Sequence, residues 1–540
     1  MRPPSNPGPS VQFVVSTGTE KADPELRKFI RSHVMQGKNK GKKLPPRVRK
    51  PKPGQAVPPP PTSAAAAAAA AARPTSKSHP SIPVPSHVLV SSRNHRSEVC
   101  DIPAPIKTAI QRNVLSAASC VRLADSTLEP FMVEVVFNFS TIAKSILFPL
   151  ESCLFFVHKP EQWVGPLGSD PAFLHAMIFT AQCFFDSQTA GINENSRGRG
   201  FMTHSRKALP HCIKAIELLR ERFATGDDES RKSMTTVGTI TSLAVLAHAS
   251  GDHLSASNHL DGLRGIVKMR EGGLKSFDEN VKLMVEVLRT DLGVALFHGD
   301  GTRFFDADGE RYAEFPDMTG LVPKLFLKGK GQVARRVPKG VDGCSELGRI
   351  WTVLREFTGL VNYAAGTGKL IPMELYADCM TSTMYRLIGM GRLGTVEAQG
   401  SSEGNKLEKE ELEVFRVGLL AYACSIFLQW KGMMRGRNHP YPFLAGQFRQ
   451  AFDKMRNGGL EPKMVLWLIM VGATALLDVP GEDERWVGDA LRENMRLCGI
   501  TEWAGLRGVL EEVMWVGLVH DALGRKVMEV VASSVMNRVA

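Results

Sequence analysis

The 540-residue sequence contains no two cysteines close enough to form a CxxC pair. This spacing excludes the cysteine pairs of common zinc sites and indicates no paired framework of a secreted disulfide-rich domain. Because most of the cysteines lie among apolar residues on helical stretches, we expect buried free thiols in a reducing compartment. The nine cysteines lie at positions 100, 120, 153, 183, 212, 344, 379, 424 and 498.

The sequence also lacks an apolar run long enough to cross a membrane. The longest run, Met464 to Leu477, falls short of the roughly 20 residues that a spanning helix needs and predicts a buried core helix. The first residues, Met1 to Pro4, do not begin the apolar segment that a signal peptide requires, so we expect no signal peptide and no membrane partner. An apolar content of 43% is nevertheless enough for a globular body.

Aromatic residues are scarce in the first hundred positions, which contain only Phe13 and Phe29. The same stretch contains 17 of the 33 prolines of the chain. Such a segment cannot bury enough apolar surface to offset the entropy lost on ordering. We therefore predict a disordered, Pro/Ala-rich tail over residues 1–100 and an α-helical domain over residues 101–540. Within the tail, Asp23 to Met35 is typical of a short amphipathic helix that needs a partner or the body to fold.

The positive charge of the chain is concentrated in that tail. The formal net charge is +12. Residues 1–100 contain 17 Lys and Arg against 4 Asp and Glu, whereas the remaining residues contain 50 against 51. The tail is therefore the part that an anionic partner would attract.

Eight basic residues of the tail fall within fifteen consecutive positions that hold no acidic residue. We interpret this stretch as a nuclear import signal and expect a nuclear protein. Two alternatives stay open: a non-specific contact with nucleic-acid phosphates and a solvated linker. The stretch holds no aromatic residue to stack on a base, which disfavours sequence-selective binding of nucleic acid. The eight residues are Lys38, Lys40, Lys42, Lys43, Arg47, Arg49, Lys50 and Lys52.

Helical periodicity is clearest between Thr235 and Gly299, where three apolar stripes are joined by very short turns. Ser250-Gly251 and Gly272-Gly273 end the first two helices, and Asp252 offers an N-cap for the second. Connections this short make neighbouring helices antiparallel. The rest of the chain continues the pattern, so we predict an all-α array of roughly a dozen antiparallel packed helices. Further helices are predicted at 171–187, 201–224, 345–364, 373–390, 410–434, 441–456, 462–477, 483–497 and 501–535, and 131–137 is assigned to helix despite its strand propensity.

Sequence motifs for chemistry are incomplete. Gly366 to Lys369 resembles a phosphate-binding loop, but Tyr363 stands where a glycine is needed and Leu370 where Ser or Thr is needed. We expect a turn that ends a helix instead. Gly343-Cys344-Ser345 lacks the closing glycine of a nucleophile elbow.

The remaining motifs are also weak. His248, His253 and His259 are spaced by five and six residues, which does not place them on one helix face for zinc, so we expect turn and surface histidines. Asp306 to Gly309 lacks the further ligands of a calcium loop but could close a small hairpin with Arg303 to Phe305 as one strand. We therefore predict no catalytic, cofactor-binding or metal-ligating residues, and an enzyme is disfavoured. A second basic stretch is expected to be a solvated loop; it contains Lys324, Lys328, Lys330, Arg335, Arg336 and Lys339.

Asp291 lies on the same helical stripe as Leu288 and Ala295. A buried carboxylate must be paired or hydrogen-bonded. We predict a structural brace in which Arg270 or Arg264, on the preceding helix, pairs with Asp291.

A set of apolar and polar positions is shared with a known family; it comprises His259-Leu260-Asp261-Gly262-Leu263, Ile266-Val267, Arg270, Gly272-Gly273, Asp291-Leu292-Gly293-Val294-Ala295, Leu466-Trp467-Leu468, Trp486, Leu497, Gly499-Ile500, Trp503, Leu510 and Trp515. Together these residues resemble the fungal-specific transcription-factor regulatory domain, the all-α region found in fungal zinc-cluster regulators. The resemblance covers about residues 130–540, and the segments Phe13-Val14 and Ile30 to Met35 are similar to the opening of a subgroup that includes acriflavine-sensitivity-control-like proteins.

The sequence departs from that family at two points. Glu271 separates Arg270 from the glycines, where the family more often has Arg-Gly-Gly, and no cysteine pattern for a zinc cluster is present. The resemblance therefore implies a nuclear transcription-regulator-like protein without its own DNA reader. Its expected partners are proteins of nuclear import and transcription, with nucleic acid contacted, if at all, non-specifically by the tail. The alternatives are a helical scaffold that binds no DNA and, third, an all-α enzyme for small molecules.

Overall fold

The computed structural model describes residues 132, 135–136, 138–140, 147–155, 160–190, 207–305, 313–322, 341–391, 393, 403–430, 439–455 and 460–539. Contacts divide the chain into two units, Met1–Ser81 and Ile82–Ala540, and every described residue belongs to the second. The predicted basic stretch between Lys38 and Lys52 lies outside the described residues, as do the tail helix and the loop with the second basic stretch.

The described part of the chain is all-α, as predicted, with 78% of its residues helical. One short parallel pairing interrupts the helices: Leu154 of β1 (Leu154–Phe155) faces Ile371 of β2 (Ile371–Pro372). The helices are η2 (Pro149–Cys153), α5 (Pro160–Ser169), α6 (Pro171–Ala190), α7 (Leu209–Thr225), α8 (Asp228–Arg231), α9 (Met234–Ser250), α10 (His253–Met269), η4 (Gly273–Asn280), α11 (Val281–His298), α13 (Glu346–Thr367), α14 (Met373–Gly389), α15 (Glu403–Ala423), η6 (Cys424–Leu428), α16 (Pro442–Met455), α17 (Pro462–Ala475), α18 (Glu484–Leu497), α19 (Trp503–Val513) and α20 (Gly517–Val539).

The predicted helical triplet is confirmed as α9, α10 and α11, and its ends are set by local chemistry. The side chain of Asp252 accepts a hydrogen bond from the Ser255 amide at 3.1 Å and caps α10. Gly251 and Gly299 close α9 and α11 in the left-handed region, at φ 90° and 80°. The third helix, α11, begins at Val281, after residues 273–280 form the 3₁₀ helix η4.

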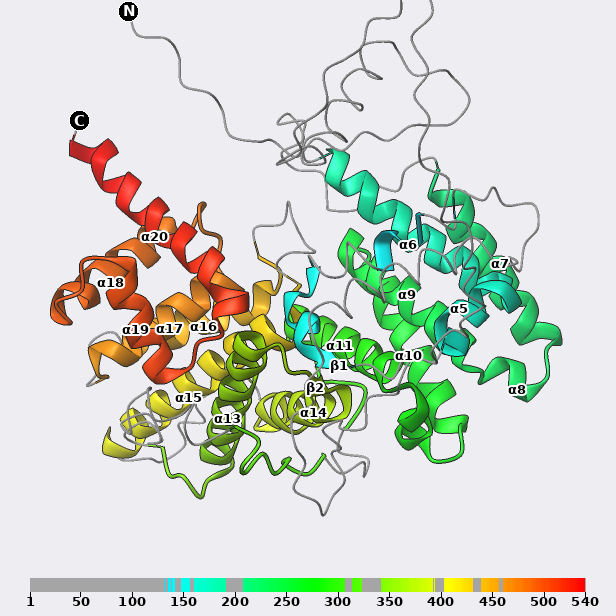
Figure 1. Cartoon of the computed structure of the whole chain (residues 1–540), viewed down its shortest axis with the longest axis horizontal. Coiled ribbons are helices and arrows are strands. Elements are labelled where there is room, and N and C mark those ends of the chain that lie inside the picture. Colours follow the sequence, from blue (N-terminus) through cyan, green and yellow to red (C-terminus); the bar gives the residue numbers. More distant parts are fainter. Residues whose placement is uncertain are drawn as a thin grey trace, which may run out of the picture. The chain divides into compact units, whose positions relative to one another are not determined.

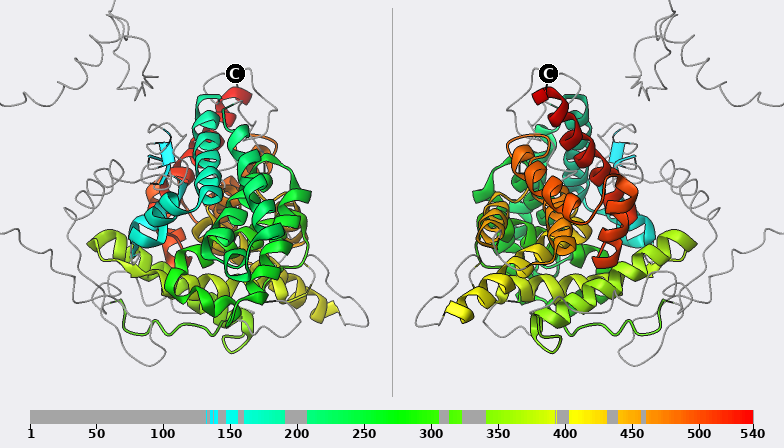
Figure 2. Two further views of the ribbon diagram at one scale, coloured as in Figure 1. Left: turned by 90° about the vertical axis from the view of Figure 1, so that its right-hand side faces the viewer. Right: turned by 90° about the vertical axis from the view of Figure 1, so that its left-hand side faces the viewer.

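Helix α11 lies in the middle of the described helices. It packs against α9 and α10 on one side and against α14 and α16 on the other. Figure 1 shows α6, α7, α9 and α10 grouped on one side of α11 and α14, with α15 to α20 grouped on the other. Figure 2 shows these two groups from opposite directions. Nearly all of α11 from Val285 to Leu296 is buried, so this helix lies within the hydrophobic core.

Three predicted elements differ from the structure. The segment 410–434 changes from the α-helix α15 to the π-helical η6 at Cys424 and stops at Leu428, where Gln429 is left-handed at φ 55°. The segment 501–535 is divided into α19 and α20, because Met514 is extended at φ −158°. Asn362 of α13 bonds the backbone there, donating to the Trp515 carbonyl at 2.8 Å and accepting from the Gly517 amide at 3.2 Å. Arg303 to Phe305 form a bend and not the predicted strand, while the hairpin turn itself lies outside the described residues.

Two other predictions are confirmed. Gly366 to Lys369 form a helix-ending turn: α13 ends at Thr367, and Gly368, at φ 76°, donates its amide to the Ala364 carbonyl. Met132, Val135 and Val136 are helical, which supports helix over strand for that segment. In the described residues, no helix is long and apolar enough to cross a membrane.

Candidate functional site

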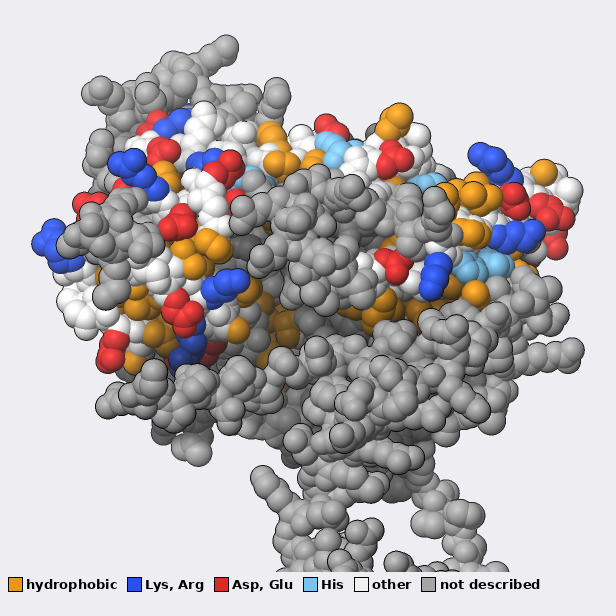
Figure 3. Space-filling model, turned by 90° about the horizontal axis from the view of Figure 1, so that it is seen from above, with side chains coloured by type: hydrophobic (Ala, Val, Ile, Leu, Met, Phe, Trp, Pro, Cys, Tyr) orange, Lys and Arg blue, Asp and Glu red, His pale blue; other side chains and the backbone are white. Residues whose placement is uncertain are grey.

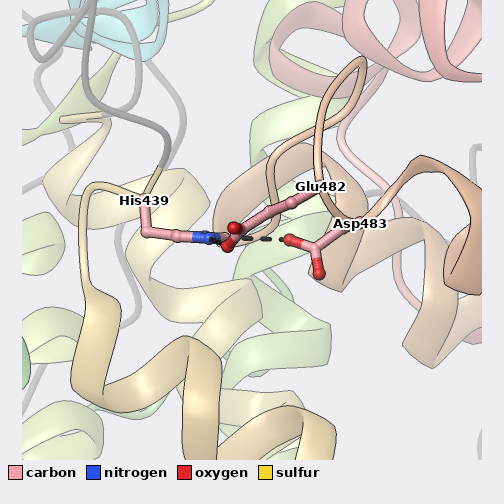
Figure 4. A group of neighbouring side chains, drawn as sticks. All are labelled: His439, Glu482 and Asp483. Carbon is pink, nitrogen blue, oxygen red and sulfur yellow. Dashed lines mark hydrogen bonds and ion pairs between the residues drawn. The ribbon is translucent and has the colours of Figure 1, made fainter. Parts of the chain in front are cut away.

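His439, Glu482 and Asp483 form a compact cluster of metal-ligating side chains between α16 and α18. One ligand atom from each residue lies within 4.8 Å of the others. Figure 4 shows the three side chains pointing toward one another, His439 from the segment before α16 and the two acids from the turn before α18. The imidazole Nε2 bonds Glu482 Oε1, and Nδ1 lies 3.8 Å from Asp483 Oδ2.

Arg449 of α16 places its guanidinium against all three residues of this cluster. Its Nη2 lies 2.6 Å from Asp483 Oδ1, 3.2 Å from Glu482 Oε1 and 3.1 Å from His439 Nε2. Hydrogen bonds from His439 and Arg449 lower the pKa of the exposed Glu482 carboxyl. The cluster therefore connects the segment before α16, and α16 itself, to the start of α18 through ion pairs and hydrogen bonds.

The turn that carries the two acids is fixed by its own hydrogen bonds. The Asp478 amide donates to Asp483 Oδ2 at 2.8 Å, and the Asp483 amide donates to the Asp478 carbonyl at 3.2 Å. Asp483 is almost completely buried, with 3% of its side chain exposed, whereas Glu482 is 56% exposed. The cluster thus has a buried side and an open side.

A second charged group lies at the core, around Arg289 of α11. Its side chain is 1% exposed and bonds Glu151 Oε1 at 2.9 Å, the Phe427 carbonyl at 2.8 Å and the Tyr376 hydroxyl at 2.5 Å. Burial opposes its charge, but Tyr376, Glu286 and Glu151 raise its pKa. Arg289 therefore binds α11 to η2, α14 and the π-helical turn η6.

Asp291 is buried and hydrogen-bonded, but the predicted partners are wrong. Its carboxylate accepts the backbone amides of Arg303 and Phe304 and, at 3.0 Å, the Tyr385 hydroxyl. Arg270 instead donates to Ser276 and to the Lys232 carbonyl, and Arg264 is not among the partners of Asp291. Burial raises the pKa of Asp291 to about 6.

Ser425 and His520 form a buried serine–histidine pair that is oriented against nucleophilic catalysis. Ser425 Oγ lies 2.7 Å from His520 Nε2. The Val516 amide donates to Nδ1, so the ring proton is on Nε2 and points at the serine. A general base needs a lone pair at that nitrogen. Burial lowers the pKa of His520 to about 3, which keeps the ring neutral.

The cysteines and histidines singled out in the sequence are only partly as expected. The described cysteines form no disulfide, and four of the seven are buried, although Cys344 is exposed. Burial raises the pKa of Cys183 to about 12, so this thiol stays protonated. His248, expected at a turn or surface, is instead fully buried, with its ring 5.0 Å from that of Trp430. It lies beside His253, while His259 is half-buried.

Sequence reasoning missed both charged groups. A signal for Arg289 exists, because it is a lone cation on the helical stripe of Val285, Leu292 and Leu296. No local pattern connects His439 with Glu482, since 43 positions separate them and neither belongs to a repeated motif.

Comparisons with models of protein families, with curated proteins and with solved structures found no match to this chain. The likeness to fungal regulatory domains therefore remains a prediction from the sequence.

Proposed function

We propose that this chain is a nuclear, transcription-regulator-like protein whose helical body binds a protein partner or an effector. The observation that carries the proposal is the division of charge: residues 1–100 hold 17 basic against 4 acidic residues, and the rest of the chain 50 against 51. Import receptors read short basic stretches such as Lys38 to Lys52.

The helical body supplies the binding role in this proposal. Its described residues form an all-α unit in which charged side chains such as Arg289 and Asp291 are bonded inside the fold. On the face seen in Figure 3, acidic and basic side chains are interspersed. Such a surface favours recognition of a protein over attraction of a polyanion.

A reporter fusion tests the import role. Residues 1–60 fused to a fluorescent protein are expected to accumulate in the nucleus of a fungal cell. The matched control replaces the eight basic residues between Lys38 and Lys52 with glutamine, and this fusion is expected to distribute evenly. Cytosolic retention of the unchanged fusion would contradict the proposal.

A second candidate function is a helical scaffold that binds proteins and leaves DNA untouched. It is favoured by the cysteine spacing, which provides no zinc cluster to place a helix in the major groove. Chromatin association of the full chain separates the two. Retention on chromatin that weakens steeply with salt fits a phosphate contact by the tail, whereas no retention even at low salt fits the scaffold.

A further inference from the structure

We propose that His439, Glu482 and Asp483 bind a divalent transition-metal ion, for whose position the guanidinium of Arg449 competes. The donor set is one imidazole nitrogen and two carboxylate oxygens, with one ligand atom of each residue within 4.8 Å of the others. Histidine with carboxylates suits Zn²⁺ and neighbouring transition metals, and three protein ligands leave a fourth position for water. This proposal is independent of the nuclear role.

Arg449 Nη2 marks the point at which the ion would sit. This single cationic nitrogen lies between 2.6 and 3.2 Å from one ligand atom of each of the three residues. Zinc bonds to nitrogen and oxygen are about 2.0–2.2 Å long, so the ligands would move in by about 1 Å or less. The position is therefore already one that attracts positive charge.

The single nitrogen Nη2 of Arg449 cannot donate a hydrogen bond to all three ligand residues. Nη2 carries two hydrogens but lies within 3.2 Å of one polar atom on each of three residues, His439, Glu482 and Asp483. A metal ion accepts a lone pair from each of the three at once. The ion would also separate His439 Nε2 from Glu482 Oε1, which bond each other directly in the structure.

The histidine is oriented as metal-binding histidines are. Its Nδ1 lies 3.2 Å from the Leu476 carbonyl, which can accept a proton on Nδ1 when Nε2 gives up the proton it donates to Glu482 and binds an ion instead. The carboxylate of Asp483 is likewise held by the Asp478 amide. These partners fix the ligands before an ion arrives and so reduce the entropic cost of binding.

One side of the cluster is exposed to solvent, so an ion can enter and the guanidinium of Arg449 can move out. Glu482 is 56% exposed, His439 13% and Asp483 3%, so the cluster opens to solvent on the Glu482 side. The side chain of Arg449 is 34% exposed. Its long stem lets the guanidinium move into water when an ion takes its position.

Calorimetric titration of Zn²⁺ into the full chain tests the proposal with paired variants. Arg449→Ala removes the competing cation and is expected to tighten zinc binding at least about tenfold. His439→Ala added to Arg449→Ala is expected to abolish that tight binding. Arg485→Ala is the matched control, because Arg485 is an exposed arginine of α18 paired with Asp489 and its loss should leave the zinc affinity unchanged.

Zinc bound to exposed thiols such as Cys344 is accounted for by the double variant, which retains every cysteine. Glu482→Gln in the Arg449→Ala background gives a second readout at an exposed residue whose substitution leaves the core intact, and it is expected to weaken binding. The proposal is overturned if Arg449→Ala fails to tighten zinc binding, or if the double variant binds zinc as tightly as Arg449→Ala alone.

Discussion

The carboxylate of Asp291 and the hydroxyl of Tyr385 form a buried hydrogen bond of 3.0 Å that ties α11 to α14. The same carboxylate accepts the backbone amides of Arg303 and Phe304, which hold the segment after α11 against the helix. Asp291 therefore acts as a brace, through amide and hydroxyl donors and without a cation of α10.

Replacement of Asp291 by alanine is expected to destabilise the fold. The change removes the acceptor of the part-buried Arg303 amide, the buried Phe304 amide and the buried Tyr385 hydroxyl, which costs about 2–4 kcal/mol in all. Urea unfolding at pH 5.5 measures the loss. Asp261→Ala is the control, because Asp261 is exposed and pairs with Arg303 at the surface, where such pairs contribute about 1 kcal/mol or less. An unchanged unfolding midpoint for Asp291→Ala would refute the brace.

The contribution of Asp291 is also expected to depend on pH. Burial raises its pKa from 3.8 to about 6, so the folded state holds the proton more tightly than the unfolded state. This stabilisation is fully present below pH 3.8 and is lost as the pH rises through 6, about 3 kcal/mol in all.

That dependence appears in the difference between the native chain and Asp291→Ala. The difference in unfolding free energy should shrink by about 1–2 kcal/mol between pH 5 and pH 8. Measuring both proteins at each pH removes the background of other titrating groups. A difference that grows with pH would show that the carboxylate is stabilised in its ionised form.

Arg289→Met is expected to be among the most destabilising changes. Breaking a buried ion pair costs about 3–5 kcal/mol, because Glu151 loses its contact of 2.9 Å with Arg289 and keeps the longer one of 3.7 Å with Lys282. Lys463→Met is the control, because its pair with Glu512 is exposed and should be worth about 1 kcal/mol or less. Adding Glu151→Gln to Arg289→Met should restore part of the loss; strict additivity of the two changes would argue against direct coupling.

Gly293→Ala is expected to destabilise the fold even though alanine favours helices. A Cβ at this position would overlap the ring of buried Trp430, and overpacking of this kind costs about 1–3 kcal/mol. Gly265→Ala is the matched control within α10, where nothing lies near the added Cβ, and it should stabilise by about 0.5–1 kcal/mol. Thermal unfolding measures whether each variant melts at a lower or higher temperature than the native chain. Shifts in the same direction for both variants would contradict this packing.

Local chemistry explains which elements could be predicted from the sequence. The ends of α9, α10 and α11 follow from Gly251, the Asp252 cap and Gly299, which act within a few residues. The break between α19 and α20 could not be predicted, because Asn362, about 150 positions earlier, bonds the backbone there.

The same limit applies to the candidate site. The burial of Asp291 follows from its stripe, whereas its Tyr385 partner lies 94 positions away. His439 precedes α16 and Glu482 precedes α18, and only the tertiary fold brings the two side chains together. The site therefore depends on tertiary contacts between distant residues, which produce no motif in the sequence.

The most direct test of the proposed nuclear role is the localisation of the full chain with its eight basic residues from Lys38 to Lys52 changed to glutamine. We predict that the unchanged chain is nuclear and that this variant is cytosolic. The control changes the six basic residues between Lys324 and Lys339 and should remain nuclear. A full chain that stays nuclear without the tail charge, or that is cytosolic from the start, would contradict the proposed role of the tail.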